Sequence, residues 1–312
     1  MTFNQRVGCD WGRSVLVEQG FEPASIIGGE MTKRTRQIDG VTVPTLLYGT
    51  AWKEERTADL VAQALRMGFR GIDTANQRRH YREADVGRVL QAELQRGLLR
   101  REDVLVQTKF TFRSGQDHRL PYDPAAPVAR QVEQSFERSL SHLGVDVVDS
   151  YLLHAPSVPQ GLGKADIEAW RVMESFYDAG KVRFIGVSNF APDQLVTLLR
   201  RARVRPAFVQ NRCYASQGWD ASMRAICARE GVTYQGFSLL TANERVVRSS
   251  LVNDIARRRQ RSAAQVIIRF ALQLGIIILT GTTNPAHMVD DLAVCEFELT
   301  VAETRAIEHA GT

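Results

Sequence analysis

The stretch Gly71-Ile-Asp-Thr-Ala-Asn-Gln-Arg-Arg-His-Tyr81 begins as a short apolar segment, reaches an aspartate, and arrives at a tyrosine within one loop. Two later stretches have a similar form: Val104-Leu-Val-Gln-Thr-Lys109 and Asp149-Ser-Tyr-Leu-Leu-His154. Each is typical of a buried strand that ends in one polar, titratable residue. Because the carboxyl ends of parallel strands meet on one face, these end residues are predicted to form an active site. The four residues are Asp73, Tyr81, Lys109 and His154.

Strand-like and helical segments alternate along the rest of the chain. The expected strands are Thr45–Gly49, Gly71–Thr74, Val104–Lys109, Val147–His154, Phe184–Val187, Phe208–Gln210, Thr233–Ser238 and Ile276–Thr280. Amphipathic stretches between them include Arg56–Met67, Pro127–Leu143, Ala165–Ala179 and Ser262–Gln273. This alternation predicts an α/β fold, a (β/α)8 TIM barrel. An open doubly wound sheet is disfavoured, because Gly49-Thr-Ala-Trp52 follows the first strand where that fold would carry G-x-G-x-x-G.

The first residues differ from this pattern. Residues 1–30 lack a basic segment followed by an apolar one, so no secretory signal is expected. The segment Ile38-Asp-Gly-Val-Thr-Val-Pro predicts an N-terminal β-hairpin with its turn at Asp39-Gly40. We therefore predict a poorly ordered extension over residues 1–32, with Met31 as a candidate natural start, and one barrel domain over residues 33–312.

Composition limits the classes of partner. The net charge of +5 is carried by scattered arginines, without the aromatic-interleaved basic stripe or zinc-ligand spacing of a nucleic-acid binder. The four cysteines form no CxxC pair, which disfavours a disulfide framework or a metal site and favours a reducing cytoplasm. The longest apolar run, Ile276 to Leu279, is too short to cross a bilayer. We predict a cytoplasmic protein, either a monomer or a weak homo-oligomer, that binds no metal, nucleic acid or membrane.

In chain order, the four strand-end residues resemble the Asp, Tyr, Lys and His tetrad of the aldo-keto reductases. The segment Arg183-Phe-Ile-Gly-Val-Ser-Asn-Phe190 matches a second, quite specific signature of that family. In most members the tyrosine lies closer to the aspartate than the eight positions between Asp73 and Tyr81, and Arg78 stands near its usual place. The run Asp-Thr-Ala-Asn-Gln-Arg is similar to a fungal, plant and bacterial branch with a longer loop. The loop is therefore expected to bulge and return Tyr81 to the site, with His80 as the rival proton donor.

The tetrad suits the reduction of a carbonyl group by a nicotinamide. Tyr81 keeps its proton at neutral pH and is expected to deliver it to the forming alkoxide. Lys109 is expected to lower the pKa of Tyr81, Asp73 to anchor Lys109, and neutral His154 to orient the carbonyl oxygen. The structural alternative is a buried Lys109–Asp73 ion pair without a catalytic role, but four such residues at strand ends favour catalysis.

The resemblance implies a nicotinamide cofactor, NADPH by family habit, with NADH as the open alternative. Ser188, Asn189 and Gln210 would bind its carboxamide, since Asn and Gln match both the donor and the acceptor of an amide. Phe237 would stack on the ring, with Tyr234 as the alternative and ordinary barrel core as the competing interpretation. The other implied cofactor contacts are Gly49, Thr50, Ser238, Leu240, Thr241, Thr282, Thr283, Asn284, His287 and Asp291.

The phosphate-binding segment departs from the family. The usual Lys-Ser-x-Asn-x-x-Arg pattern is replaced by Gly281-Thr-Thr-Asn-Pro-Ala-His287. Hydrogen-bonding groups remain at a helix N-terminus, which favours anions, although Asn284-Pro285 alone also reads as a helix cap. The cation is missing at Gly281, and a neutral His287 replaces an arginine that would clamp a phosphate bidentately. Positions 281 and 287 are therefore expected to set the choice between NADPH and NADH.

The substrate is predicted only as a class. Trp52, Phe110 and Phe112 follow strands and are expected to contact it on the active face. The chain ends at Thr312 without the loop that covers the substrate in many members, so an open, shallow pocket for bulky carbonyl compounds is expected. The predicted activity is NAD(P)H-dependent reduction of an aldehyde or ketone to the alcohol. The alternative is a non-catalytic nicotinamide-nucleotide sensor or regulatory subunit; a metal-dependent hydrolase would need a His/Asp ligand cluster that is lacking.

Overall fold

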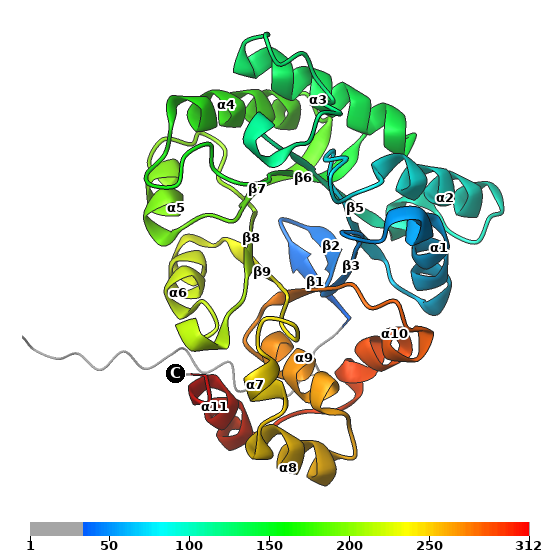
Figure 1. Ribbon diagram of the computed structural model, residues 1–312, viewed down its shortest axis with the longest axis vertical. Helices are drawn as coiled ribbons and strands as arrows, with labels where there is room; N and C mark the ends of the chain where they lie inside the picture. Colours follow the sequence, from blue (N-terminus) through cyan, green and yellow to red (C-terminus); the bar gives the residue numbers. More distant parts are fainter. Residues whose placement is uncertain (1–33, 312) are drawn as a thin grey trace, which may run out of the picture. The chain divides into compact units, whose positions relative to one another are not determined.

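The computed structural model describes residues 34–311 of the chain. The extension predicted over residues 1–32 lies outside the described residues. Over the described range, strands form a closed ring and helices surround it (Figure 1). This arrangement places every strand end of the ring on one of two faces.

Eight parallel strands, counted over residues 34–311, close the barrel, with β10 pairing back to β3. They are β3 (Leu46–Gly49), β4 (Gly71–Asp73), β5 (Leu105–Phe110), β6 (Val148–Leu153), β7 (Val182–Ser188), β8 (Phe208–Arg212), β9 (Thr233–Phe237) and β10 (Ile277–Thr280). The predicted TIM barrel is confirmed, and each predicted strand is present with its ends shifted by no more than two residues.

Helices follow the strands and cover the outside of the barrel. They are α1 (Thr57–Met67), α2 (Glu83–Gln95), α3 (Val128–Leu143), α4 (Lys164–Asp178), α5 (Pro192–Leu199), α6 (Ala221–Glu230), α7 (Glu244–Val247), α8 (Ser250–Arg259), α9 (Ala263–Gln273), α10 (Pro285–Leu292) and α11 (Val301–His309). Helix α1 buries one stripe that includes Leu60 and Val61, and it ends at Gly68, whose φ of 109° suits a residue without a side chain. Helices α2 and α3 come so close at Gly87 that an added Cβ would lie 1.9 Å from the backbone oxygen of His142.

A hairpin of β1 (Thr35–Ile38) and β2 (Val41–Pro44) precedes the barrel, as predicted. Asp39 and Gly40 form its turn with φ of 47° and 78°, a conformation that an Asp-Gly pair supports. In Figure 1 the hairpin projects over the centre of the ring. Val43 of β2 packs in one apolar cluster with Leu47 and other residues near the strand starts. The hairpin therefore closes the amino-terminal end of the barrel.

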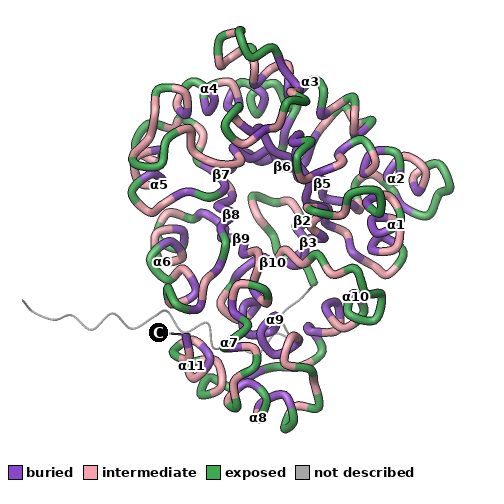
Figure 2. The backbone as a smooth tube through the Cα atoms, in the orientation of Figure 1, coloured by how far each residue is buried: buried purple, intermediate pink, exposed green. Residues whose placement is uncertain are grey.

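The interior of the barrel changes from apolar to polar along the strands. Strand β5 shows this clearly, because side chains of a strand alternate between its two sides. Leu105 belongs to the apolar cluster beneath the hairpin, Gln107 donates a hydrogen bond to Gln235 of β9, and Lys109 stands near the carboxyl end. Figure 2 shows the strands buried along most of their length. Polar side chains therefore gather at the carboxyl ends of the strands.

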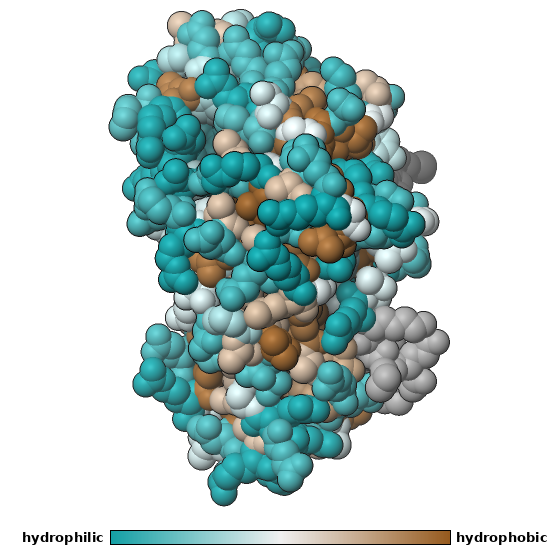
Figure 3. Space-filling view, turned by 90° about the vertical axis from the view of Figure 1, so that its right-hand side faces the viewer, coloured by the Kyte–Doolittle hydropathy of each residue, from teal (hydrophilic) through white to brown (hydrophobic). Residues whose placement is uncertain are grey.

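The outer surface is mostly hydrophilic. On the face drawn in Figure 3, hydrophobic residues form separate patches among polar ones. The largest buried side chains, such as Phe136 and Phe270, are in the core. Between residues 34 and 311, no helix has both the length and the apolar character needed to span a membrane.

Candidate active site

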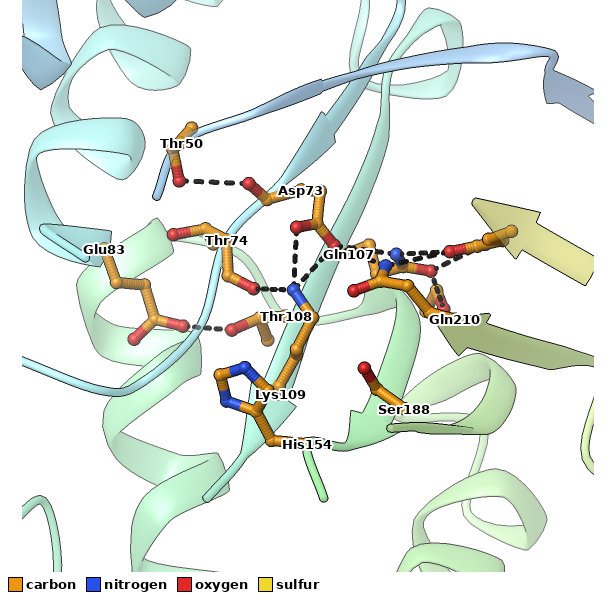
Figure 4. A network of polar contacts seen from close by, with 12 residues as sticks. Thr50, Asp73, Thr74, Glu83, Gln107, Thr108, Lys109, His154, Ser188 and Gln210 are labelled. Carbon is orange, nitrogen blue, oxygen red and sulfur yellow. Dashed lines mark hydrogen bonds and ion pairs between the residues drawn. The ribbon is translucent and has the colours of Figure 1, made fainter. Parts of the chain in front are cut away.

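Lys109 and Asp73 form a buried ion pair at the carboxyl ends of β5 and β4. The ammonium of Lys109 lies 2.7 Å from each carboxylate oxygen of Asp73 and also donates to the backbone oxygen of Thr74 at 2.9 Å (Figure 4). Lys109 is 0% exposed and Asp73 is 3% exposed. Burial lowers the pKa of Lys109, while Asp73 acts in the opposite direction. A charged lysine in such a place needs a partner of this kind, because an isolated buried charge is very costly.

Glutamine side chains surround this ion pair from neighbouring strands. Gln107 and Gln210 each donate to an Asp73 oxygen, at 2.8 and 3.0 Å, and both also donate to Gln235. Ser150 donates to Gln107 from β6. The carboxylate of Asp73 thus accepts amide hydrogens in addition to those of Lys109. The sequence analysis missed Gln107 and Gln235, although their places two residues before Lys109 and Phe237 on inward-facing positions are a usable signal.

Tyr81 lines the cleft at the end of a loop turn, and the expected bulge relative to the family stays a prediction. The backbone oxygen of Gln77 accepts from the amides of His80 and Tyr81 at 3.3 and 3.0 Å, which closes a turn over the extra residues. The Tyr81 ring lies 5.3 Å from the Lys109 ammonium and makes an edge contact with the His154 ring at 5.8 Å. The loop therefore brings the tyrosine into contact with both the lysine and the histidine.

The pKa of Tyr81 departs from the expectation. Burial raises it above its ordinary value, and the negative charge of Asp73 adds to the rise. The expected lowering by Lys109 is not found, because Asp73 neutralises that ammonium at both carboxylate oxygens. In this structure the phenol of Tyr81 therefore holds its proton firmly.

His154 follows β6, and its side chain is partly buried. Its Nδ1 lies 2.6 Å from the hydroxyl oxygen of Thr111. Burial holds the pKa of His154 well below its usual range, and the nearby charges of Lys109 and His80 lower it further. The expected neutral form therefore has a physical cause in the structure.

His80, the rival proton donor, occupies a different place. Its ring stacks against Trp52 with 3.7 Å between centroids, and its backbone oxygen accepts from the Trp52 amide. Trp52 is 68% exposed, so this pair lies at the solvent side of the cleft. Tyr81, by contrast, is 9% exposed, and its ring contacts the Lys109 ammonium and the His154 ring.

One cleft of about 710 Å³ joins these groups to the expected cofactor residues. It extends from the tetrad, past the ends of β7, β8 and β9, to β10 and helices α9 and α10. The predicted residues that line it are Gly49, Trp52, Asp73, Tyr81, His154, Ser188, Asn189, Gln210, Phe237, Ser238, Leu240, Thr241, Thr282, His287 and Asp291. Lys53, which follows the first strand beside Trp52, also lines it, as do Arg212 and Asp290, which had no expected role.

The middle of the cleft presents a distinct set of polar groups. The amide nitrogen of Asn189 donates to the His154 backbone oxygen at 2.8 Å and to the Ser188 hydroxyl oxygen at 3.1 Å. The amide nitrogen of Gln210 donates to Asp73 and Gln235, both at 3.0 Å. Each amide has thereby used its two N–H groups, so its oxygen remains as an acceptor. The Ser188 hydroxyl, which accepts from Asn189, keeps its own hydrogen as a donor.

The far end of the cleft carries both a basic and an acidic side chain, Lys53 and Asp291. The ammonium of Lys53 donates to the backbone oxygen of Gly281, and a Cβ added at Gly281 would lie 3.3 Å from it. Lys53 therefore stands where the missing side chain of position 281 would begin. Asp291 accepts from the Thr280 hydroxyl at 2.6 Å, and burial raises the pKa of Asp291 to about 6.

Several predicted contacts do not reach the cleft. Phe110 and Phe112 were expected to touch the substrate, but Phe110 is 0% exposed and packs against Phe112 and Tyr122 in the hydrophobic core. The reason is strand alternation: Lys109 points into the barrel, so Phe110 points toward the helices. Thr50, Thr283 and Asn284 are likewise absent from the lining. Thr50 is buried and donates to the Asp73 backbone oxygen, and Asn284 caps α10 by accepting from the amide of Ala286.

The two candidates for the stacking aromatic are separated by the structure. Phe237 lines the cleft, and the guanidinium of Arg212 lies 5.5 Å over its ring. Tyr234 is buried and donates to the Asp220 carboxylate at 2.9 Å. Phe237 is therefore the aromatic available to a ligand. Among the described residues, no group of His, Cys, Asp and Glu side chains has the arrangement of a metal site.

Comparison with known proteins identifies the family. A model of the aldo/keto reductase family matches residues 45–311. A probable NAD(P)H-dependent D-xylose reductase of Emericella nidulans is 30% identical over 307 residues, covering 86% of this chain and 90% of that protein. An aldo-keto reductase of Mycobacterium avium is 34% identical over 278 residues, covering 88% of this chain and 89% of the relative.

Solved structures agree with this match. An aldo/keto reductase from Brucella melitensis has a TM-score of 0.75 at 25% identity, covering 88% of this chain and 98% of that one. The fold is also that of a Bombyx mori aldo-keto reductase in complex with NADP, with a TM-score of 0.73 at 24% identity and coverage of 88% and 91%. The chain therefore belongs to the aldo/keto reductase family of oxidoreductases.

Proposed function

We propose that this protein reduces an aldehyde or ketone to the alcohol with NADPH, and that Tyr81 is the proton donor. The observation that carries the proposal is the place of Tyr81: its ring contacts both Lys109 and His154 and lines the cleft that also holds Ser188 and Asn189. A proton donor, a polarising imidazole and a binding site for an amide thus share one cleft. This combination suits hydride transfer to a carbonyl group better than a structural ion pair.

The middle of the cleft is complementary to a primary carboxamide. Such a group offers two N–H donors and one carbonyl acceptor. The amide oxygens of Asn189 and Gln210 are two acceptors, and the Ser188 hydroxyl is one donor. Phe237 supplies an apolar ring beside them. These residues would hold the nicotinamide of the cofactor, whose chemical contribution when bound is a hydride.

The residues of the chain supply the rest of the chemistry. His154, kept neutral by burial, would donate to the substrate oxygen and orient it. Tyr81 would then pass its phenolic proton to that oxygen as negative charge develops there. The raised pKa of Tyr81 is compatible with this role, because an alkoxide is a far stronger base than a phenolate. Lys109, held by Asp73, would stabilise the phenolate that remains.

The far end of the cleft supports NADPH as the cofactor. Lys53, Thr282 and His287 line that end and could face a phosphate group, with Lys53 as the cation in place of a side chain at Gly281. Asp290 and Asp291 oppose this preference through their negative charge. The Bombyx mori complex with NADP points the same way, while the name of the Emericella nidulans relative, NAD(P)H-dependent, allows either cofactor.

The test is consumption of NADPH with a panel of aromatic aldehydes, diketones and aldoses, the last chosen because one relative is named as a D-xylose reductase. Turnover that disappears in Tyr81→Phe supports the proposal. Tight NADPH binding without turnover of any panel member would instead identify a nucleotide sensor. Lack of both binding and turnover would overturn both interpretations.

A further inference from the structure

A threonine hydroxyl contacts Nδ1 of the His154 imidazole in the candidate active site. Thr111 follows β5 directly, is 5% exposed, and places its Oγ1 2.6 Å from Nδ1 of His154. Over residues 34–311, this nitrogen is the one hydrogen-bond partner of the Thr111 hydroxyl. Neither the motifs of the sequence nor the proposed chemistry assigns Thr111 a role.

The loop after β5 holds Thr111 in place. The backbone oxygen of Thr111 accepts from the Tyr122 hydroxyl at 2.9 Å and from the Gln116 side chain at 3.3 Å. Gln116 also donates to the backbone oxygen of Asn76 at 2.9 Å, which links this loop to the one that carries Tyr81. These hydrogen bonds fix the backbone of Thr111, so its hydroxyl is held in place beside His154.

The identity of the donor in this hydrogen bond determines what His154 can do. A neutral imidazole carries one proton, and the hydrogen bond at one nitrogen decides which nitrogen carries it. If Thr111 donates to Nδ1, the proton is on Nε2 and can point at a substrate oxygen. If Nδ1 donates to Thr111, Nε2 is a bare acceptor that would repel a developing alkoxide. A distance of 2.6 Å favours the hydroxyl as donor, since hydroxyl donors make shorter hydrogen bonds than N–H donors.

The chemical nature of the partner also matters. His142 shows the contrast within this chain, because its Nδ1 lies 2.9 Å from the carboxylate of Glu83. A carboxylate can only accept, so it keeps a proton on the ring nitrogen that it faces. The hydroxyl of Thr111 is neutral and can donate. It therefore leaves His154 uncharged while directing its single proton to the far nitrogen.

We propose that Thr111 is a positioning residue that holds His154 in the tautomer with its proton on Nε2, directed toward the substrate oxygen. The inference rests on the proposed function, because it gives His154 the task of donating to the carbonyl group. It adds a residue that acts through His154 and touches neither substrate nor cofactor.

Nitrogen NMR of the full chain with labelled histidine tests the tautomer without relying on activity. The chain has six histidines, and the His154 signals are identified by their loss in His154→Gln. We expect protonated Nε2 and unprotonated, hydrogen-bonded Nδ1 in the wild type and in Thr111→Ser. Thr111→Val, which has nearly the same shape but no hydroxyl, should lose this single state. A proton on Nδ1 in the wild type, or unchanged signals in Thr111→Val, would overturn the inference.

Kinetics provide the second arm. Thr111→Val should lower kcat by about 10- to 100-fold, since an oriented donor to the oxyanion is lost, while the Kd for NADPH stays within about twofold. Thr111→Ser should restore kcat to within about threefold, which a purely steric role would not predict. Thr197→Val is the matched control, because it removes a hydroxyl that bonds only within α5. Thermal unfolding of each variant confirms that the fold is retained.

The two arms separate the inference from the proposed function. If Thr111→Val changes the tautomer while His154→Gln remains fully active, His154 is not catalytic, and both the tetrad and the role of Thr111 in it fail. If His154→Gln is inactive and Thr111→Val keeps both tautomer and kcat, the proposed function stands and the role of Thr111 fails.

Discussion

Replacement of Lys109 by methionine tests the buried centre of the site most directly. Methionine fills much of the space of the lysine stem but leaves Asp73 without its cation. Removal of one partner from a buried ion pair costs about 3–5 kcal/mol. Asp73 keeps the hydrogen bonds from Gln107 and Gln210, which reduce this cost but do not cancel the charge.

Protonation limits the cost and makes it depend on pH. The Asp73 carboxylate, once left without its cation, can be neutralised by taking up a proton. This uptake costs about 1.4 kcal/mol for each pH unit above the unfolded aspartate pKa of about 3.9. That limit is about 4 kcal/mol at pH 7 and about 2 kcal/mol at pH 5.5. Because the folded variant then holds a proton more tightly than the unfolded chain, its loss of stability must shrink as pH falls. We expect Lys109→Met to lose about 3–4 kcal/mol at pH 7 and about 2 kcal/mol at pH 5.5.

Urea unfolding at the two pH values measures this difference, and NADPH consumption measures activity. The double variant Asp73→Asn/Lys109→Met removes the stranded charge and should regain most of the stability at pH 7 while remaining inactive. Lys109→Met with wild-type stability at pH 7, or with a loss that does not change with pH, would refute the reasoning from a buried, charged pair.

Three further predictions concern the rest of the cleft. Tyr81→Phe should lower kcat by at least about 100-fold with little change in the Kd for NADPH; normal activity in Tyr81→Phe together with an inactive His80→Ala would move the proton donor to His80. Because burial raises the pKa of Asp291 to about 6, its charge costs stability in full above pH 6, and that loss shrinks as pH falls below 6 and is gone near the unfolded value of about 3.9. Asp291→Asn should therefore stabilise the protein by up to about 3 kcal/mol at pH 8 but hardly at pH 4 in urea unfolding, and an equal gain at both would exclude this cause. His287→Arg should strengthen NADPH binding by about 1–2 kcal/mol and leave NADH binding nearly unchanged, as measured by titrating each cofactor. Equal gains in affinity for both cofactors would show that residue 287 does not face the phosphate.

The sequence was sufficient to predict the barrel, and it placed the candidate tetrad residues near strand ends, for a local reason. Each strand is a short buried run with a glycine or polar stop, and Asp73, Lys109 and His154 stand at or just after such stops. The bulge before Tyr81 was expected only from the resemblance to a branch with a longer loop, and it stays a prediction.

The failures concern quantities that depend on the whole fold. Phe110 and Phe112 were placed in the substrate site because they follow a predicted strand, but the alternation of β5 turns Phe110 into the core. The pKa of Tyr81 was predicted with the wrong direction, since its sign depends on burial and on how completely Asp73 neutralises Lys109. The burial of a side chain and the combined effect of the charges around it depend on groups that lie far apart in the sequence, so both require the folded structure.

The hydrogen bonds around Gln210 have a stereochemical consequence. Asp73 can only accept, so it turns both N–H groups of Gln210 inward and leaves the amide oxygen toward the cleft. A nicotinamide turned over by half a revolution would bring its own carbonyl oxygen against that acceptor. In the proposed nicotinamide site the carboxamide would therefore fit in one orientation, and the ring would present one of its two sides to the substrate. NADPH deuterated at one of the two C4 hydrogens should transfer its label, and NADPH deuterated at the other should retain it. The aspartate that anchors the lysine would in this way also decide which of two mirror-related hydrogens leaves the cofactor.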